Sequence, residues 1–521
     1  MNARDVRQAL EAAVSLHRTG RLQAAEAAYR EVLGREPENP DALHLLGVLA
    51  AQSGQPDRAA ELIRRAIGAR PAVAEFHANL ALSLRKAGRL DEALPAYRRA
   101  AELDPERPEA WFNLAKACLD AGAPEHAVPA LGRAIALRPA YHEAVNDLGV
   151  AHTRLGDLSA AHDAYRRVLE LAPVHVMARS NLAATLYNLG RLDEAGAMAR
   201  SAIDLDAGCA EAHLTLGASL LISGRFAEGW PEYEWRWHCY GMAGEASPYP
   251  QPRWDGSDPA GRTILLRSEQ GLGDTIQFVR YAPLLAARGA RVVLGCRPVL
   301  KALLQTVRGI DAVVADDEPL PPFDLQVPLL SVPGLVGATL ATIPADVPYV
   351  FPNPAARERW RARLALARRA LTVGLVWAGQ PQNRTDRWRS IALSALAPLA
   401  AVPGVSFWSL QGGDAARQIE AAPFAVVDAG AAERDFADVA ALMASLDLVI
   451  SVDTAGAHLA GALGRPVWTL LPAAPDWRWL TEREDTPWYP TMRLFRQQAP
   501  GDWAGVIGRV ARALADLAAR R

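Results

Sequence analysis

The residues best suited to chemistry lie in two short turns in the second half of the chain. The earlier turn, Glu269-Gln-Gly-Leu-Gly-Asp274, directly follows an apolar run that predicts a strand. Its glycines permit a tight loop, and a carboxylate on such a loop could act as a general base that takes a proton from an attacking hydroxyl. In the alternative interpretation, Asp274 only caps the helix that follows. The residues assigned to the side of the attacking hydroxyl, the acceptor side, are Gln270, Gly271, Gly273 and Gln277.

The later turn, Asp453-Thr-Ala-Gly456, lies between the apolar run Leu448-Val-Ile450 and a helical stretch. This order predicts a buried parallel strand that delivers a helix N-terminus to the carboxyl edge of a sheet. The unpaired N–H groups and the positive end of the helix dipole suit a phosphate there. Thr454 could cap the helix or donate to a phosphate oxygen, and Gly456 lets the backbone come close. In the alternative, this is an ordinary strand-to-helix turn that Asp453 caps.

An arginine-rich loop, Asn383-Arg-Thr-Asp-Arg-Trp-Arg-Ser390, is expected at the same sheet edge, because it follows the strand that ends at Trp377-Ala-Gly379. Its arginines could clamp a diphosphate or a sugar carboxylate by forked hydrogen bonds. One or two of these arginines, which are Arg384, Arg387 and Arg389, could instead be solvated surface residues.

Three more candidates lie near this edge. Gln411 ends the next strand and could meet a base or a ribose, and His458 could donate to a phosphate or pack between two lobes. The segment Asp476-Trp-Arg-Trp479 also follows a strand, and its Trp pair is more typical of a core than of a stacking platform. The turn Glu269–Asp274 is neither a dinucleotide fingerprint nor a P-loop, because Ile276 stands where a third glycine is needed and no Gly-Lys-Ser/Thr follows.

The bulk composition excludes several classes of function. The chain has 521 residues, a net charge of −2 and no cluster of Lys and Arg, which argues against nucleic acid or an anionic membrane as the main partner. Its four cysteines lie far apart, so we expect no disulfide framework or zinc site and a cytoplasmic location. No signal-peptide core and no apolar run of about 18 residues is present, so we expect no membrane span.

The first half of the chain is an internal repeat. A step of 34 residues relates the glycines Gly20, Gly54, Gly88, Gly122, Gly156, Gly190 and Gly224. The same step relates Pro37, Pro71, Pro105, Pro139 and Pro173, and also Ala25, Ala59, Ala93, Ala127, Ala161 and Ala195. The Gly suits a turn between two helices, the Ala close helix contact, and the Pro the end of the second helix. This pattern resembles the tetratricopeptide repeat family.

Stacked repeats of this kind curve into a superhelix with a concave groove. We interpret the groove as a docking surface for a protein; the alternative is a spacer or a self-association module. A seventh repeat is degenerate, with Ala207 in place of the proline and Gly229 in place of the alanine. An aromatic segment, Gly229-Trp-Pro-Glu-Tyr-Glu-Trp-Arg-Trp237, then joins the array to the next domain or, alternatively, stacks on a sugar.

From Thr263 onward, short apolar runs alternate with helical stretches, which predicts βαβ units and parallel sheets. The predicted organisation is a repeat array over 1–240, a linker over 241–261, and two Rossmann-like lobes over 262–348 and 349–521. Two such lobes with a cleft between them form the layout of the GT-B glycosyltransferases, and the carboxyl edges of both sheets would face that cleft.

The motifs of these lobes resemble the heptosyltransferase-type family-9 glycosyltransferases, over roughly residues 260 to 515. The resemblance rests on the Gly-Asp turn after the first strand and on Asp-Thr-x-Gly-x-His-x-Ala near the end. It implies that Asp274 is the base and that the late turn holds the phosphates of a nucleotide-sugar donor. The expected donor-binding residues are Trp377, Gly379, Arg384, Arg389, Gln411, Asp453, Thr454, Ala455, Gly456 and His458.

In one segment the chain departs from this family. The family's Ser/Thr-x-x-Lys segment is replaced here by the loop 383–390, which has Arg instead of Lys and leaves the nucleotide and the sugar open. The combination of repeats with such lobes also resembles O-linked N-acetylglucosamine transferases and bacterial flagellin glycosyltransferases.

The hypothesis from sequence is therefore an inverting, metal-independent glycosyltransferase that modifies a protein hydroxyl, with flagellin or another surface protein as the acceptor implied by that resemblance. In such a site, helix dipole and arginines offset the leaving diphosphate in place of a cation, so no metal or other cofactor is expected. One alternative is a heptosyltransferase-like enzyme of lipopolysaccharide assembly, and another is a repeat scaffold without activity.

Overall fold

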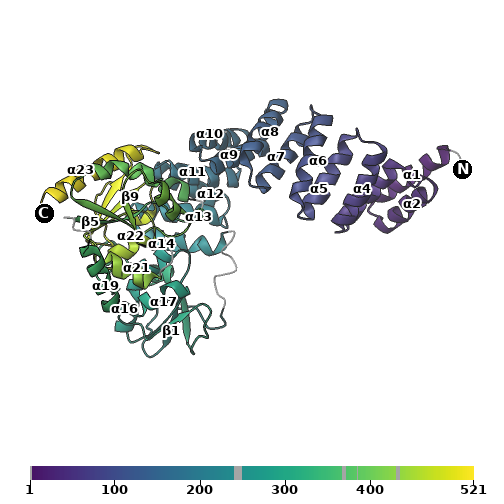
Figure 1. The fold of residues 1–521 in the computed structure, drawn as a ribbon. Helices are drawn as coiled ribbons and strands as arrows, with labels where there is room; N and C mark the ends of the chain where they lie inside the picture. Colours follow the sequence, from purple (N-terminus) through teal and green to yellow (C-terminus); the bar gives the residue numbers. More distant parts are fainter. Residues whose placement is uncertain (1–2, 240–248, 367–370, 384, 430–434, 521) are drawn as a thin grey trace. The chain divides into compact units, whose positions relative to one another are not determined.

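The protein is described here from a computed structural model, over residues 3–239, 249–366, 371–383, 385–429 and 435–520. The chain divides into two compact units, Met1–Thr185 and Leu186–Arg521, and each is described by itself. The first unit is a solenoid of helix pairs, and the second contains parallel α/β sheets (Figure 1). The predicted fold class is confirmed. Much of the predicted linker, residues 240–248, lies outside the described residues.

The solenoid consists of antiparallel helix pairs, one pair to each 34-residue repeat (Figure 1). Its helices are α1 (Ala3–Arg18), α2 (Leu22–Arg35), α3 (Pro40–Gln52), α4 (Pro56–Ala69), α5 (Ala74–Lys86), α6 (Leu90–Leu103), α7 (Pro108–Asp120), α8 (Pro124–Leu137), α9 (His142–Leu155) and α10 (Leu158–Leu171). The next helix, α11 (Val176–Asn188), contains the boundary between the two units.

The repeated residues have the roles that their types predict. Each periodic glycine has a positive φ between 72° and 85° and forms the turn inside a helix pair, where a side chain would strain the backbone. Each periodic alanine is fully buried where the two helices touch. Small residues also allow close approach elsewhere, because a Cβ on Gly149 would lie 2.5 Å from the ring of Tyr165. The period therefore reflects helix packing.

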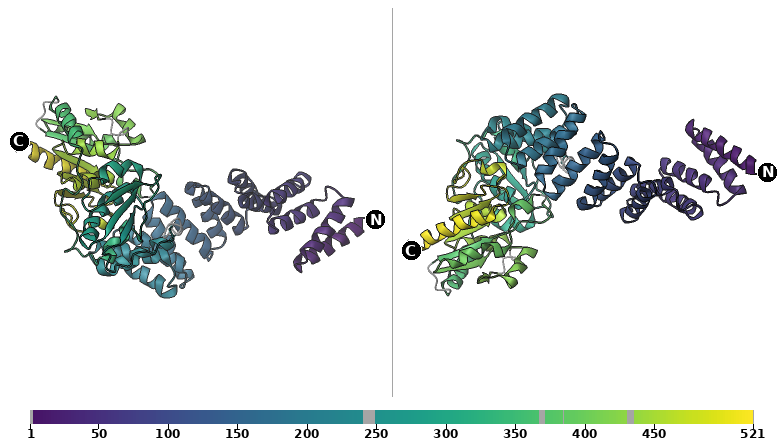
Figure 2. Two further views of the ribbon diagram at one scale, coloured as in Figure 1. Left: turned by 90° about the horizontal axis from the view of Figure 1, so that it is seen from below. Right: turned by 90° about the horizontal axis from the view of Figure 1, so that it is seen from above.

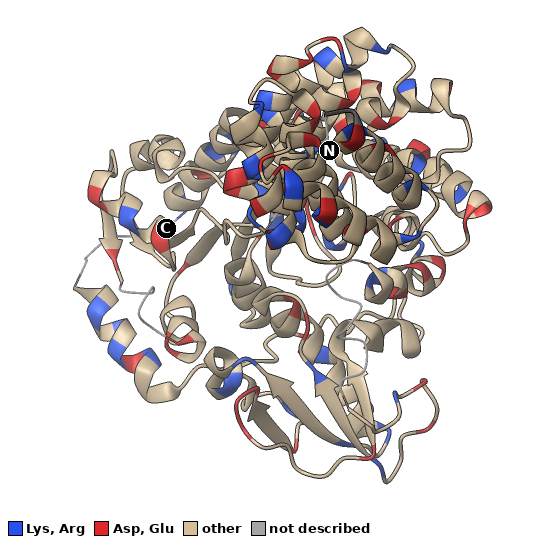
Figure 3. Ribbon diagram, turned by 90° about the vertical axis from the view of Figure 1, so that its right-hand side faces the viewer, with Lys and Arg blue, Asp and Glu red and all other residues tan. Residues whose placement is uncertain are grey.

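Acidic and basic side chains are interspersed over the repeat helices (Figure 3). Successive repeats are linked by exposed ion pairs, for example Arg64–Glu92 at 2.5 Å and Arg65–Glu38 at 2.7 Å. Exposed pairs of this kind add little stability. They give the solenoid a surface of mixed sign, as the net charge of the chain predicts.

The second unit begins with the last helices of the repeat array. These are α12 (Leu192–Leu205), α13 (Ala210–Ile222), the short α14 (Phe226–Tyr233) and the 3-10 helix η1 (Glu234–His238). Gly229 replaces the repeat alanine because α14 lies unusually close to α13: a Cβ on Gly229 would lie 2.8 Å from the Leu221 side chain. The degenerate repeat is therefore an adaptation to tighter packing.

The aromatic segment joins these helices to the α/β part, as predicted. The Trp230 indole donates to the Ala338 carbonyl at 3.0 Å, and its ring meets Trp477 edge to face. Arg236, which is 1% exposed, forms a buried ion pair with Glu269, with both guanidinium–carboxylate distances at 3.0 Å. The alternative of a sugar-stacking surface does not fit Trp230, because its side chain is buried in the core.

The first sheet contains four parallel strands in the order β3-β2-β1-β4 within the described residues. The strands are β1 (Thr263–Arg267), β2 (Arg291–Cys296), β3 (Ala312–Ala315) and β4 (Leu325–Pro328). Its helices are α15 (Leu272–Phe278), η2 (Val279–Tyr281), α16 (Ala282–Ala287), α17 (Pro298–Leu304), η3 (Leu329–Ser331) and α18 (Val332–Leu335).

The second sheet contains six parallel strands in the order β10-β9-β8-β5-β6-β7, again among the described residues. Figure 2 shows the α/β part of the chain, coloured from teal to yellow, from two further sides. The strands are β5 (Leu371–Val376), β6 (Val405–Ser409), β7 (Val426–Asp428), β8 (Leu448–Val452), β9 (Val467–Leu471) and β10 (Met492–Arg496). Its helices are α19 (Pro354–Ala365), α20 (Asp386–Arg389), η4 (Leu393–Ala401), η5 (Asp414–Ala421), α21 (Phe436–Met443), α22 (Ala455–Ala462), η7 (Trp477–Trp479) and α23 (Trp503–Ala519).

The sequence predicted most of these strands within a residue or two but missed β10. Its residues, Met-Arg-Leu-Phe-Arg, include two charged side chains and no continuous apolar run, and the strand lies at the sheet edge against β9. The helical stretch after β1 is divided by η2 into α15 and α16. Among the described helices, none combines the length and the apolar character needed to cross a membrane.

Candidate functional site

Each sheet has a point at which its strand order reverses. In the first sheet the chain runs from β1 to β2 and β3 and then returns to β4 on the other side of β1. In the second it runs from β5 to β6 and β7 and then returns to β8 on the other side of β5. Open parallel sheets bind ligands outside the carboxyl ends of the strands at such points. The turns at Asp274 and Asp453 follow β1 and β8, so both lie at these switch points.

The two turns are in direct contact. A Cβ on Gly273, at the N-terminus of α15, would lie 3.3 Å from the Cα of Ala455 and 2.9 Å from the ring of His458. Ala455 and His458 belong to the first turns of α22. Only a residue without a side chain lets these two helix N-termini meet, and the two predicted site segments therefore form one site.

Asp274 is paired with an arginine of the other lobe. Its Oδ1 accepts from the Arg478 guanidinium, and its Oδ2 accepts from the backbone N–H of Gly271 at 2.8 Å. Asp274 is the third residue of α15 and Gly271 is its N-cap, so the alternative of an N-cap aspartate does not hold, although the second bond closes the first turn of the helix. The side chain of Asp274 is 19% exposed. Burial raises the pKa of Asp274, and the Arg478 charge opposes this effect.

Arg478 is held on several sides. Its Nε donates to the side-chain oxygen of Gln277 at 2.8 Å, and it donates to Asp476 Oδ1 at 2.7 Å. Its guanidinium also lies over the rings of Phe278 and Trp477. These contacts join α15 of the first lobe to η7 of the second and fix the orientation of the guanidinium.

Asp453 shares this charged environment. It is 8% exposed, and burial, followed by the negative charge of Asp476, raises the pKa of Asp453 to about 6. The positive charge of Arg389 opposes the shift at Asp453 and at Asp274. The alternative in which Asp453 caps the helix does not fit, because Thr454 is the N-cap residue of α22.

Thr454 does not cap through its side chain. Its hydroxyl lies 3.3 Å from that of Ser451 and 3.4 Å from the Val452 carbonyl. Gly456 lies against the end of β5, because a Cβ there would be 3.0 Å from the Val376 side chain. The turn therefore combines close backbone approach with the N–H groups of a helix start, as the sequence predicts.

His458 is buried between aromatic rings. Its Nδ1 lies 3.0 Å from the Tyr489 hydroxyl, and its ring stacks on Trp479 at 5.2 Å. Burial lowers the pKa of His458 well below its usual value, and Arg478 has the same effect, so the ring is neutral near pH 7. The structure therefore shows the packing that was one of its two predicted roles.

Two predicted donor-binding side chains serve the protein core instead. Trp377 is fully buried in the apolar cluster beneath the sheet edge, which leaves only its backbone near the site. Gln411 is 4% exposed; its Oε1 accepts from the N–H groups of Trp377 and Ala378 at 3.0 Å, and its Nε2 donates to the Ala378 and Gly412 carbonyls. The side chain of Gln411 joins the ends of β5 and β6, and all its polar atoms are engaged.

Gly379 and Arg389 lie together at the end of β5. A Cβ on Gly379 would lie 2.2 Å from Asp386 and 2.9 Å from the Arg389 guanidinium, so the loop folds tightly over this glycine. Arg389 is 20% exposed on its side chain and has its Nε 3.3 Å from Asp386. Arg387 is exposed and lies over the ring of Trp388. Arg384 lies outside the described residues.

The residues predicted for the acceptor side occupy the α15 turn. Gln270 has a positive φ of 59°, and its carbonyl accepts from Arg297 at 3.0 Å. Gln277 is fully buried; its Oε1 binds Arg478, and its Nε2 has no hydrogen-bond partner. Gly271 and Gly273 supply the backbone contacts given above.

Sequence reasoning missed Arg478, Asp476 and Tyr489 as parts of the site. The sequence placed the segment 476–479 at the correct sheet edge, but its Trp pair was interpreted as part of a core. A buried arginine between aromatic rings is a signal that could have been used, because such a charge needs a buried partner. In the described part of the chain, no group of three or more His, Cys, Asp and Glu side chains is arranged to hold a metal ion.

Comparison with known proteins agrees with this architecture. The tetratricopeptide repeat model matches residues 4–74, 79–142, 120–175 and 146–208. The model described as glycosyltransferase family 9 (heptosyltransferase) matches residues 415–492. This second match includes the Asp453 turn and Arg478, but Asp274 lies outside it.

The chain is similar to Protein FlbA of Caulobacter vibrioides, with 29% identity over 327 residues, which is 57% of this chain and 53% of FlbA. The chain thus spans about half the length of that curated relative. The repeat region is similar to the solved structure of YrrB, a TPR protein with an unusual peptide-binding site, at 20% identity and a TM-score of 0.33 over 36% of this chain and 95% of that one. It is also similar to MamA, at 24% identity and a TM-score of 0.30 over 31% of this chain and 95% of MamA.

The fold and these matches make the chain similar to a tetratricopeptide repeat array followed by an α/β glycosyltransferase domain, with the family-9 similarity lying over residues 415–492.

Proposed function

We propose that this protein is an inverting glycosyltransferase that moves a sugar from a nucleotide-sugar to a hydroxyl group of a protein, without a divalent metal. The observation that carries the proposal is the contact between the Asp274 turn and the Asp453–His458 turn. Because of this contact, a base on one side and a phosphate site on the other can act on a single sugar.

In the proposed reaction, Asp274 takes the proton of the acceptor hydroxyl while that oxygen attacks the anomeric carbon. The bond between the anomeric carbon and the phosphate oxygen breaks, and the nucleoside diphosphate leaves with the electron pair. Attack from the face opposite the leaving group inverts the anomeric configuration. The developing negative charge is met by the N–H groups at the start of α22 and by Arg389.

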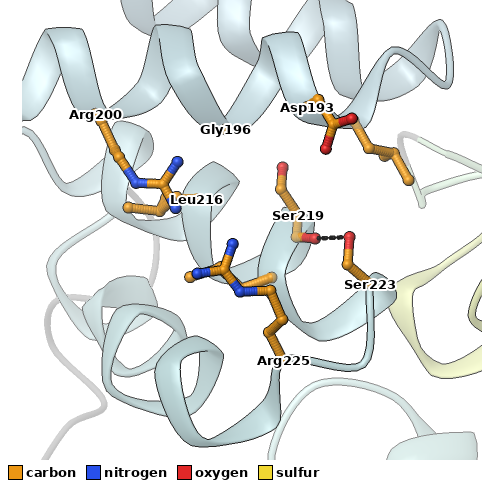
Figure 4. A pocket seen from close by; sticks show the side chains of 9 residues that line it. Asp193, Gly196, Arg200, Leu216, Ser219, Ser223 and Arg225 are labelled. Atoms are coloured by element: carbon orange, nitrogen blue, oxygen red, sulfur yellow. Dashed lines mark hydrogen bonds between the residues drawn. The ribbon is translucent and has the colours of Figure 1, made fainter.

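The repeat array supports a protein acceptor, because stacked repeats present a long surface suited to polypeptides. In the last repeats, a pocket is lined by residues of α12 and α13 and by Arg225 at the start of α14. Arg200 and Arg225 point into this pocket, beside Ser219 and Ser223 (Figure 4). Arg225 is paired with Glu228 and Asp193 also lines the pocket, so these groups fit a polar segment of the partner.

The test is Asp274→Asn in the full chain, which keeps the size of the side chain and removes its basicity. Transfer is followed as nucleoside diphosphate released from a panel of uridine, guanosine and adenosine diphosphate sugars. We expect a loss of about 10² to 10⁴ in kcat/KM, the usual contribution of a general base. The matched control is Asp485→Asn, an exposed aspartate paired with Arg483. Near-normal transfer by Asp274→Asn would show that the base is assigned wrongly.

A second candidate is transfer to a glycolipid of lipopolysaccharide assembly, favoured by the heptosyltransferase description of the matching family. A nucleotide-sugar with a labelled sugar, supplied together with the purified protein to a lysate of cells that lack it, would separate the two acceptors. Label recovered in protein supports the first proposal, and label recovered in the lipid extract supports the second. The unpaired, buried cysteines are in keeping with action in the reducing cytoplasm.

A further inference from the structure

Asp274 presents a problem for the proposed mechanism. A base must be ionised to accept a proton, but Asp274 lies at the contact between two lobes, where burial disfavours the charged form. Its Gly271 bond supplies only one neutral donor. The Asp274 carboxylate therefore needs a fixed positive charge close to it, bound so that part of the carboxylate stays accessible to the acceptor hydroxyl.

Arg478 meets these requirements. It reaches Asp274 from the second lobe, with its own side chain 6% exposed against 19% for Asp274. A carboxylate has about four lone-pair sites, and the bonds from Arg478 and Gly271 occupy two of them. The remaining exposure leaves room for an incoming hydroxyl.

The Arg478 guanidinium is held in place by groups that take no part in the proposed proton transfer. Gln277 Oε1 and Asp476 Oδ1 accept from its other N–H groups at 2.8 and 2.7 Å, and Phe278 and Trp477 flank it. A planar fork with five donors can satisfy three such acceptors in a defined geometry, which an ammonium group cannot reproduce.

We propose that Arg478 is the positioning residue of this site: bound to Asp476 and Gln277, it holds the Asp274 carboxylate ionised and oriented for proton transfer once the two lobes are in contact. This inference rests on the proposed function and extends it to a residue outside the two predicted turns. It links base activation to lobe contact, because Asp274 and Arg478 come from different sheets.

The charged groups around Asp274 determine the expected pH dependence. Arg478 of η7, Asp476 directly before η7 and Arg389 of α20 act on it, and the neutral ring of His458 lies against the neighbouring Gly273. Arg478 is the largest influence opposing the rise in the pKa of Asp274. Its removal should raise that pKa, and the rate should then be lost at higher pH than in the wild type.

The experiment compares Arg478→Met with the wild type by the pH profile of kcat/KM, using the diphosphate sugar of highest turnover in the panel. We expect the acid limb to move upward by about 1 to 3 pH units, the usual effect of one adjacent arginine. Infrared difference spectra against Asp274→Asn follow the protonated carboxyl band of Asp274 without any substrate and should show the same shift. An unchanged limb and an unchanged band in a folded variant would overturn the proposal.

Arg478→Lys is the second variant, because it keeps the charge if the Met variant does not fold. We expect its acid limb close to that of the wild type and its kcat lower by more than about tenfold, because the fork that aligns Asp274 is lost. A wild-type kcat in this variant would also overturn the proposal. Arg483→Met is the matched control on the same segment, where Arg483 pairs with the exposed Asp485. It should leave the profile unchanged.

The two proposals fail in different ways. Normal transfer by Asp274→Asn would show that Asp274 is not the base, and the proposed role of Arg478 would then be wrong as well. A different result is loss of transfer by Asp274→Asn with an acid limb that does not shift in Arg478→Met. This result would support the proposed function and contradict only the role of Arg478.

Discussion

Gly273, at the start of α15, packs against Ala455, at the start of α22, so closely that a Cβ on Gly273 would lie 3.3 Å from the Ala455 Cα. The two residues are far apart in sequence and come from different sheets. Their contact brings two helix N-termini together and leaves Asp274 and Asp453 in one charged environment.

Gly273→Val should separate the two turns. Its Cβ would meet the His458 ring at 2.9 Å, and its methyl groups would extend further into Ala455. Overpacking of this kind costs about 1 to 3 kcal/mol, and we expect a lower Tm together with a large loss of transfer. Gly508→Ala is the control, because Gly508 lies within α23 with open space around its Cα. Wild-type transfer by Gly273→Val would contradict the contact described here.

Arg236→Met should destabilise the second unit strongly. Arg236 and Glu269 have 1% and 4% of their side chains exposed, so removal of the arginine leaves a buried carboxylate without its counter-charge. Breaking a buried pair in this way costs about 3 to 5 kcal/mol. Urea unfolding measures the loss. The matched control, Arg493→Met, breaks an ion pair with Glu484 in which both side chains are well exposed and should have little effect.

Asp453→Asn should stabilise the protein at neutral pH. The pKa of Asp453 is raised to about 6 in the folded state, so between pH 4 and pH 6 the folded chain holds a proton that the unfolded chain has released. The wild type therefore loses stability from this group as pH rises through that window, by at most about 3 kcal/mol. Urea unfolding at pH 4 and pH 8 should show a gain from Asp453→Asn that is larger at pH 8. An equal effect at both pH values would contradict the raised pKa.

A chelator should leave transfer unchanged. The proposed mechanism assigns the charge of the leaving diphosphate to Arg389 and the α22 N-terminus, so no divalent cation is needed. Nucleoside diphosphate release with and without EDTA, followed by addition of Mg²⁺ or Mn²⁺, measures this directly. Loss of activity with EDTA that is restored by either cation would show that the reaction uses a metal.

Much of the fold follows from local patterns in the sequence. The 34-residue period predicted the helix pairs, because Gly at a turn and Ala at a helix contact act through their immediate neighbours. Alternating apolar runs predicted the parallel strands of both lobes. The edge strand β10 was missed, because its half-charged pattern is weak without the partner strand beside it.

The candidate site could be predicted only in part. The turns at Asp274 and Asp453 were found because a strand, a small-residue turn and a helix lie together in sequence. Trp377 and Gln411 were assigned to a ligand, but their side chains are engaged within the core and the sheet edge. Proximity to a strand end says where a residue lies and does not say which way its side chain points.

The repeat array, the strands of both sheets and the two turns with the acidic residues are predictable from the sequence, since each is a pattern among residues close together in the chain. The pairing of Asp274 with Arg478 is visible only in the folded chain. These residues lie 204 positions apart, and the pair forms because packing between the lobes brings α15 against α22 and η7 and removes both charges from water together.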